Sequence, residues 1–136
     1  MVEQFEFSLP PYKRGFHLIT DEISKNLKNL PKKGIVNIFI RHTSAGLTIN
    51  ENADAAVRKD FETFFSRFIP DATTRFEHNT EGDDDMPAHL KSSIIGQSIT
   101  IPITNHRLNL GVWQGIYLCE FRDHGGRRTI VISIIN

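Results

Sequence analysis

Hydrophobic and polar residues alternate along most of this chain, or give way to short runs rich in Val, Ile and Phe. Alternation with a period of two is typical of half-buried strands, and short β-branched runs are typical of buried ones. Gly, Pro and Asn residues separate these runs, as expected for turns. The pattern predicts eight strands, at residues 3–9, 15–20, 34–42, 46–51, 97–103, 107–110, 112–121 and 127–135, with 122–128 as a hairpin turn between the last two.

Three segments instead show apolar residues at helical spacing. A short helix is expected after Thr20, whose hydroxyl can cap it. A long helix is expected over 53–69, with an apolar face formed by Val57, Phe61, Phe64, Phe65 and Phe68. A third helix is expected over 85–95, with Pro87 in its first turn and Gly96 just past its end. Strands outnumber helices, which favours an α+β fold with a mostly antiparallel or mixed sheet and two to three helices on one side.

Composition narrows the class of protein without naming a function. The 16 Lys and Arg residues balance the 16 Asp and Glu residues, so neither nucleic acid nor an anionic membrane is an expected partner. The single cysteine, Cys119, lies in an apolar run and is expected to be buried in a strand. Residues 1–136 show no repeat or linker, so one domain is expected. With no signal-peptide pattern and no apolar run of membrane length, a cytoplasmic location is expected.

The acidic segment 76–90, FEHNTEGDDDMPAHL, is the first candidate site. Crowded carboxylates raise one another's pKa values, and a bound divalent cation would relieve that repulsion. His89 lies in the first turn of a helix, where the positive end of the helix dipole favours the neutral imidazole that ligates metals. We therefore predict a cation site formed by His89, His78 and a nearby aspartate of this segment. The alternative is a solvated acidic loop in which Asp84 or Asp85 only caps the helix.

The segment 41–54, RHTSAGLTINENAD, is the second candidate site. His42 ends a strongly apolar strand and is followed by Thr43 and Ser44, and residues at strand ends often line clefts. Asn50, Glu51 and Asn52 precede the long helix. Local capping and turn formation would account for the asparagines and hydroxyls, but capping does not require His42 or Glu51.

Segment 110–128 supplies a third set of candidates. Trp113, flanked by two glycines, is expected to be a core or interface anchor rather than a stacking platform. Gln114 is polar within an otherwise apolar run and needs a partner. Arg128, with Arg127 beside it, has the fork geometry that grips phosphate, although two arginines in an exposed hairpin can also be merely solvated.

Six short motifs carry a resemblance: His42–Ala45, Asn50–Asn52 with Asp54, His78 with Glu81–Gly82, Asp84–His89, Leu110–Gly111 and Trp113–Gly115. With these residues the chain resembles the YjbQ-like family, whose members are often called secondary thiamine-phosphate synthases. The match follows the family's order over most of the chain. It departs at Val112, where Thr is common, and at Asp85, where Asn is frequent. The second departure adds a negative charge near the proposed site.

The resemblance implies an α+β subunit of a homotrimer with a weak or secondary thiamine-phosphate synthase activity. That reaction joins hydroxymethylpyrimidine diphosphate to a thiazole phosphate and releases diphosphate. In this interpretation His78, Asp84 and His89 bind zinc, another transition metal or magnesium. His42 and Glu51 act as acid–base or orienting groups. The expected contacts to the small phosphorylated substrate are Thr43, Ser44, Asn50, Asn52, Trp113, Gln114 and Arg128.

Two other functions would use the same residues. Two neutral histidines favour a transition metal over magnesium, which prefers oxygen ligands, and this supports a metal-assisted hydrolase with Glu51 as general base. A non-catalytic trimeric binding protein, whose histidines hold an interface together, is the third candidate. The chain contains no P-loop, GxGxxG, GxSxG or CxxC motif, so nucleotide folds and serine hydrolases lack their signatures.

Overall fold

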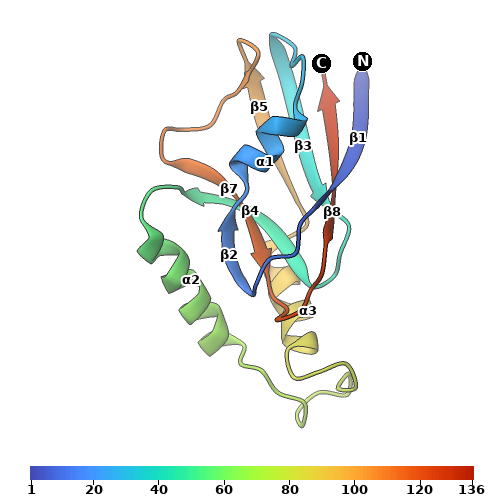
Figure 1. Cartoon of the computed structure of the whole chain (residues 1–136), viewed down its shortest axis with the longest axis vertical. Coiled ribbons are helices and arrows are strands. Elements are labelled where there is room, and N and C mark those ends of the chain that lie inside the picture. Colours follow the sequence, from blue (N-terminus) through green and yellow to red (C-terminus); the bar gives the residue numbers. More distant parts are fainter.

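A computed structural model describes residues 1–136, which form eight strands and three helices (Figure 1). The elements are, in chain order, β1 (Val2–Leu9), β2 (Gly15–Leu18), α1 (Thr20–Asn26), β3 (Lys33–Ile40), β4 (Ala45–Glu51), α2 (Ala55–Phe68), α3 (Asp85–Ile95), β5 (Ser98–Thr104), β6 (Arg107–Leu108), β7 (Gln114–Glu120) and β8 (Arg128–Ile135). The periodicity of the sequence thus located every element to within a few residues. No helix is long and apolar enough to cross a membrane.

The strands form two sheets in which every pair is antiparallel, and this confirms the α+β prediction. One sheet has the order β1-β8-β3-β5-β6 and the other the order β2-β7-β4. The predicted hairpin at 122–128 is wrong, because β7 and β8 lie in different sheets and this segment crosses between them. Alternation along a strand reports which residues are buried, but it does not report which strand lies beside it.

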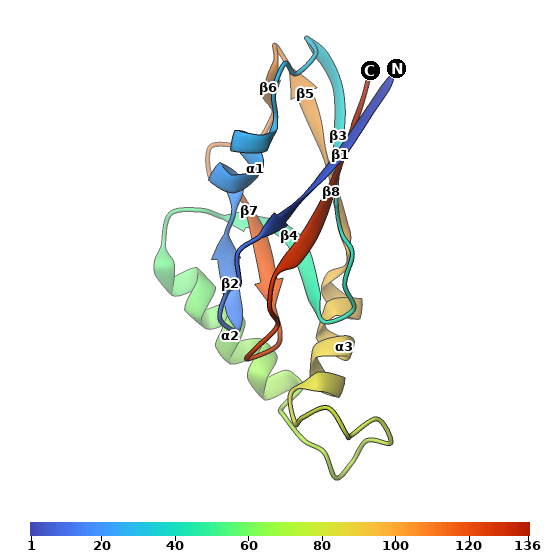
Figure 2. The ribbon, with the colours of Figure 1, turned by 45° about the vertical axis from the view of Figure 1, so that its right-hand side comes forward.

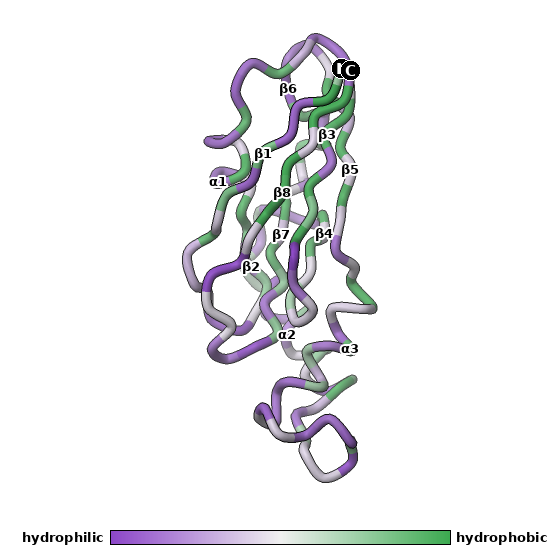
Figure 3. Tube along the Cα trace, turned by 90° about the vertical axis from the view of Figure 1, so that its right-hand side faces the viewer, coloured by the Kyte–Doolittle hydropathy of each residue, from purple (hydrophilic) through white to green (hydrophobic).

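The main core lies between the inner faces of the two sheets. Alternate residues of β3 point inward, and the facing residues of β8 do the same, so that Ile38 and Ile132 are direct partners. Each fully buried isoleucine stabilises the fold by about 1.5–3 kcal/mol relative to an exposed one. Hydropathy follows this arrangement, because the strands are mostly hydrophobic and the segment that leads into α3 is mostly hydrophilic (Figure 3).

The helices belong mainly to the three-stranded sheet (Figure 2), where α2 contacts β2, α3 contacts β4 and α1 contacts β7. A second core of five buried residues lies under α2 and α3: Phe16, Ala88, Tyr117, Cys119 and Phe121. Cys119 is fully buried, as the sequence predicted, and burial raises the pKa of its thiol.

Two helix details differ from the sequence predictions. Phe61 and Phe65 of α2 pack on the second core, but Phe64 and Phe68 are 58% and 60% exposed. Only a narrow row of side chains on α2 contacts the three-stranded sheet, so part of the predicted apolar face stays exposed to solvent. Thr20 does not cap α1, which begins after Ile19 without a side-chain cap. The Thr20 hydroxyl instead accepts a hydrogen bond from the backbone N–H of Ile116 at 2.9 Å.

Candidate functional site

Two histidines and one aspartate meet where the segment before α3 enters that helix. Asp85 and His89 lie one helical turn apart on the same face of α3, and His78 reaches them from the preceding loop. The Oδ2 atom of Asp85 is 2.6 Å from Nε2 of His78 and 3.3 Å from Nε2 of His89. The two imidazole centroids are 5.3 Å apart. We call these three residues the His–Asp–His cluster.

The geometry of the His–Asp–His cluster suits a metal ion. One ligand atom from each side chain lies within 4.8 Å of the other two. Donor atoms with metal bonds of about 2.1 Å stand about 3.0–3.4 Å apart around one ion. The 3.3 Å from Asp85 to His89 fits that spacing, whereas the 2.6 Å to His78 is a direct hydrogen bond that would lengthen around an ion. The Asp85 side chain is 5% exposed, whereas that of His78 is 45% exposed, so one side of the cluster faces solvent.

Neighbouring groups orient the cluster. Nδ1 of His89 is 2.9 Å from the carbonyl oxygen of Thr43. A carbonyl can only accept, so Nδ1 carries the proton, and Nε2, which faces Asp85, is the ring nitrogen placed to bind a metal, the arrangement typical of ligating histidines. Arg122 donates from Nη1 to the other carboxylate oxygen of Asp85 at 2.5 Å. Burial alone would raise the pKa of Asp85, but its bond to His78 and the charge of Arg122 outweigh burial and lower the pKa.

Asp84, the predicted aspartate ligand, is not part of the cluster. Its Oδ2 accepts hydrogen bonds from Nε of Arg122 at 3.1 Å and from the Asp123 backbone N–H at 2.9 Å. Burial opposes ionisation of Asp84, yet these bonds prevail and lower its pKa. Asp84 therefore holds Arg122 in place, and the carboxylate between the imidazoles is that of Asp85.

His42 precedes Thr43, whose carbonyl contacts His89, but its own ring is engaged elsewhere. Its Nε2 accepts the backbone N–H of Thr129 at 2.8 Å, which leaves its proton on Nδ1. Burial, followed by the positive charge of Arg128, lowers the pKa of His42, so the ring is neutral at pH 7. The next residue, Thr43, contributes its carbonyl to His89.

Arg128 is not a surface phosphate contact. Its side chain is 5% exposed, and Nε donates to Glu120 at 2.8 Å while Nη2 donates to the hydroxyl of Ser44 at 3.0 Å. Ser44, a predicted substrate contact, is also buried, and its hydroxyl accepts a hydrogen bond from this guanidinium. The sequence alone does not show whether an arginine in a segment between two strands is buried or exposed to solvent, because that depends on how the two sheets pack.

The remaining predicted residues gather at the opposite end of β4 and β7. These strands pair antiparallel, with Ala45 opposite Glu120 near the cluster and Glu51 opposite Gln114 at the far end. Seven strand residues span about 20 Å, so Glu51, Asn50, Asn52, Trp113 and Gln114 do not reach the cluster of the same chain.

At that far end these side chains support the backbone. The Glu51 carboxylate accepts the N–H groups of Ala53 and Asp54, at 3.1 Å and 3.0 Å, just before α2. Asn52 donates to the carbonyls of Val112 and Gln114, both at 3.1 Å. Trp113 is 63% exposed and so is not a core residue.

Sequence analysis missed Arg122 and Asp85 as site residues. The sequence suggested Asp85 as a helix cap and as an added negative charge near the site but not as a ligand, although its spacing of four from His89 was a usable signal. Arg122 had no signal in the sequence, because only the position of the end of β7 in the fold brings it to the site.

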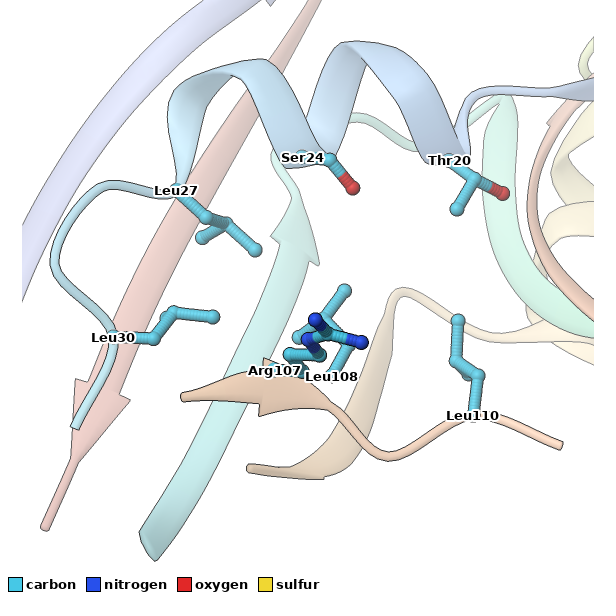
Figure 4. A pocket seen from close by; sticks show the side chains of 7 residues that line it. All are labelled: Thr20, Ser24, Leu27, Leu30, Arg107, Leu108 and Leu110. Carbon is cyan, nitrogen blue, oxygen red and sulfur yellow. The ribbon is translucent and has the colours of Figure 1, made fainter. Parts of the chain in front are cut away.

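A separate hollow of about 330 Å³ lies between α1 and β6, lined by four leucines, Thr20, Ser24 and Arg107 (Figure 4). None of the predicted site residues lines it.

Comparison with known proteins places this geometry in a family. The model of the family described as UPF0047 protein YjbQ-like matches residues 5–136. The chain is 47% identical over 133 residues to the UPF0047 protein YjbQ of Escherichia coli O157:H7, covering 96% of each chain. The crystal structure of a hypothetical protein from Aeropyrum pernix K1 is similar with a TM-score of 0.86 and 26% identity, covering 98% of each chain.

A second crystal structure supports the same assignment. It is that of an uncharacterized conserved protein of the yjbq/upf0047 family from Clostridium acetobutylicum, with a TM-score of 0.80 and 35% identity. The similarity covers 96% of this chain and 99% of that one. The chain therefore belongs to the UPF0047 (YjbQ-like) protein family.

Proposed function

We propose that the protein binds a divalent transition metal at His78, Asp85 and His89 and uses it to act on a small phosphorylated molecule. The observation that carries this proposal is the convergence of three ligand atoms within 4.8 Å, one of them on a solvent-facing imidazole. Two imidazoles and one carboxylate are donors that zinc, iron or manganese accept, whereas magnesium favours oxygen alone. A bound ion would act as a Lewis acid toward phosphate oxygens and would acidify water.

The specific reaction we propose is the thiamine-phosphate synthase-type transfer that the family resemblance implies. Diphosphate leaves with additional negative charge, and a cation next to a positively charged side chain would offset that charge. Arg122 supplies such a side chain, because it is partly exposed beside the cluster while it donates to Asp85. Glu51 is not assigned a role at this site, since its carboxylate caps backbone N–H groups before α2.

A metal-assisted hydrolase is the second candidate, and the donor set supports it. Two nitrogen ligands with one carboxylate, and a side open to solvent, are typical of sites at which a metal activates water. The exposed carboxylate of Glu81, 3.1 Å from Nε2 of His78, would then be the group placed to receive a proton.

Metal analysis of the untagged protein tests the binding site. We expect about one equivalent of a transition metal per chain, and much less in His89→Ala with an unchanged circular dichroism spectrum. His106→Ala is a matched control, because His106 also places Nδ1 against a backbone carbonyl, that of Leu30, but lies outside the cluster. A parent protein that binds no transition metal would contradict both candidate functions.

Two assays of the metal-loaded protein separate the candidates. Diphosphate release that requires hydroxymethylpyrimidine diphosphate together with thiazole phosphate supports the transferase. Turnover of a simple phosphate ester without a second substrate supports the hydrolase. Each activity should be lost in His89→Ala and retained in His106→Ala.

A further inference from the structure

A buried ion pair is connected to the His–Asp–His cluster through neighbouring segments of the chain. The carboxylate of Glu120, at the end of β7, is fully buried, and Arg128, at the start of β8, is nearly so. Nε and Nη2 of Arg128 donate to the two oxygens of Glu120, which makes the pair bidentate. Nη2 also donates to the hydroxyl and the carbonyl of Ser44, at 3.0 Å and 3.3 Å. The Glu120–Arg128 pair thus joins three segments from both sheets.

The backbone of Gly125 packs directly against the Glu120–Arg128 pair. A Cβ atom at this position would lie 2.5 Å from Oε1 of Glu120 and 2.6 Å from Nη2 of Arg128. Only a residue without a side chain lets the 122–127 segment lie this close to the pair. The backbone at Gly125 is not in the left-handed region, so space rather than backbone conformation requires glycine here.

The Glu120–Arg128 pair reaches the cluster by two routes. On one side it holds Ser44, and the carbonyl of the preceding residue, Thr43, accepts Nδ1–H of His89. On the other side the second oxygen of Glu120 accepts the backbone N–H of Arg122 at 3.2 Å. The Arg122 side chain then donates to Asp85. Both groups that orient metal ligands are therefore attached to backbone that this pair holds.

Stability does not explain a pair of this kind. Desolvating two charges costs about as much as their attraction returns, and apolar residues of similar volume often replace such pairs without loss of stability. Fixed hydrogen-bond geometry is what the apolar residues cannot supply. Outer-shell groups that orient ligands commonly change metal affinity by about 10- to 100-fold.

We propose that Glu120 and Arg128 are positioning residues for the metal site, which fix the Thr43 carbonyl on His89 and the Arg122 guanidinium on Asp85. This inference rests on the proposed metal binding. Arg128 would then help to orient the ligands His89 and Asp85, instead of contacting phosphate as expected from the sequence.

The double variant Glu120→Met/Arg128→Met tests the proposal, because it keeps the volume and removes both charges together. Titration with Co²⁺ alone gives both an affinity and, from the visible spectrum, the coordination geometry. We expect a folded protein with about 10- to 100-fold weaker Co²⁺ binding and an altered spectrum. Ile103→Val, a core change at the far end of β5, should lower stability without changing either readout.

Gly125→Ala is the second test, and it applies even if the double variant fails to fold. Its methyl group must displace the pair by steric contact alone, so we expect weaker Co²⁺ binding with an altered spectrum in an otherwise unchanged sequence. Wild-type affinity and spectrum in either folded variant would overturn the positioning role while leaving the metal site intact. A wild-type protein that does not bind Co²⁺ would overturn the proposed function itself.

Discussion

Asp85 is the residue on which the candidate site depends, because each of its two oxygens has a different task. Oδ2 faces the two imidazoles, and Oδ1 accepts from Arg122. One carboxylate is thereby held in a single orientation while it is almost completely buried. A buried charged group needs hydrogen-bonding partners, and those of Asp85 are His78 and Arg122, with Nε2 of His89 3.3 Å away.

Asp85→Asn should weaken metal binding by more than the roughly 100-fold that outer-shell changes reach, because the amide lacks the charge and one acceptor oxygen. Competition with a chromogenic chelator measures this affinity. Asp83→Asn is the control, since Asp83 is an exposed acid in the same segment outside the cluster. Equal affinities in the two variants would remove Asp85 from the ligand set.

His42 makes stability depend on pH. Burial and the charge of Arg128 lower its pKa in the folded state, so the unfolded chain takes up a proton at a higher pH than the folded chain does. The contribution of His42 to the free energy of unfolding should therefore be complete above about pH 6.5, and stability should fall as the pH drops below that value. Urea unfolding at several pH values between 8 and 5, in steps of about one unit, measures this change.

His42→Gln is the comparison variant for that experiment, because its side-chain oxygen can still accept the Thr129 N–H but does not titrate. It should lose less free energy of unfolding over the same pH range than the parent protein does. An identical loss in both proteins would mean that other groups produce the pH dependence.

At the scale of elements, α2 shows how local contacts begin a helix that packs only partly on the core. Oδ1 of Asp54 accepts the N–H of Ala56 at 2.9 Å, and the Glu51 carboxylate accepts two further N–H groups just before the helix. Together they satisfy donors that have no partner within the helix. No residue of α2 is fully buried, so these caps are a large share of what fixes its start.

Asp54→Ala should lower the free energy of unfolding by about 1 kcal/mol, the usual cost of losing an N-cap. Chemical denaturation with circular dichroism detection measures the difference. Asp60→Ala, which removes an exposed acid within α2, should stay within about 0.5 kcal/mol of the parent protein. A neutral Asp54→Ala would show that Glu51 alone is sufficient.

The elements themselves could be predicted from the sequence because their periodicity is local. The runs around Ile38 and Ile132 have the composition of buried strands whatever lies next to them. Strand order is not local, so the sequence placed the last two strands in one hairpin although β7 and β8 belong to different sheets. Ile38 and Ile40 of β3 pair with Ile132 and Ile130 of β8, which lie 94 and 90 positions further along the chain, and no short motif encodes such pairing.

The candidate site was predictable to the same extent. The segment with His78 and His89 was recognisable from its unusual composition, and the geometry brings these two rings together. Asp84 was predicted as the ligand, but in the structure Asp84 engages Nε of Arg122 and it is Asp85 that faces the imidazoles. That choice is made by the packing of β7 beside α3, not by spacing within the loop.

At the scale of the whole molecule, the five-stranded sheet leaves apolar side chains on its outer face. Ile35, Phe39 and Ile135 are each about two fifths exposed there. Val131 lies opposite Phe39 and Ile135 opposite Ile35, so these side chains form neighbouring pairs. A surface of this kind is typical of contacts between subunits.

The homotrimer implied by the family resemblance stays a prediction, and this face is where we expect its contact. Phe39→Lys should shift the protein toward smaller species in sedimentation velocity, because a lysine in the contact would lose its hydration. Val112→Lys is the control, since Val112 is even more exposed but lies on a loop. A monomeric parent protein, or an effect of Val112→Lys alone, would contradict this assignment.

The pairing of β1 along the whole of β8 has one more consequence. Residues 129–135, Thr-Ile-Val-Ile-Ser-Ile-Ile, carry no charge and no proline, the composition of segments that stack into amyloid-like fibrils. β1 covers the free edge of that strand over eight residue pairs and places Glu3 and Glu6 at the new edge. Proteolysis that removed the first nine residues would therefore do more than shorten the chain: it would bare a template for aggregation that the intact amino terminus keeps shielded.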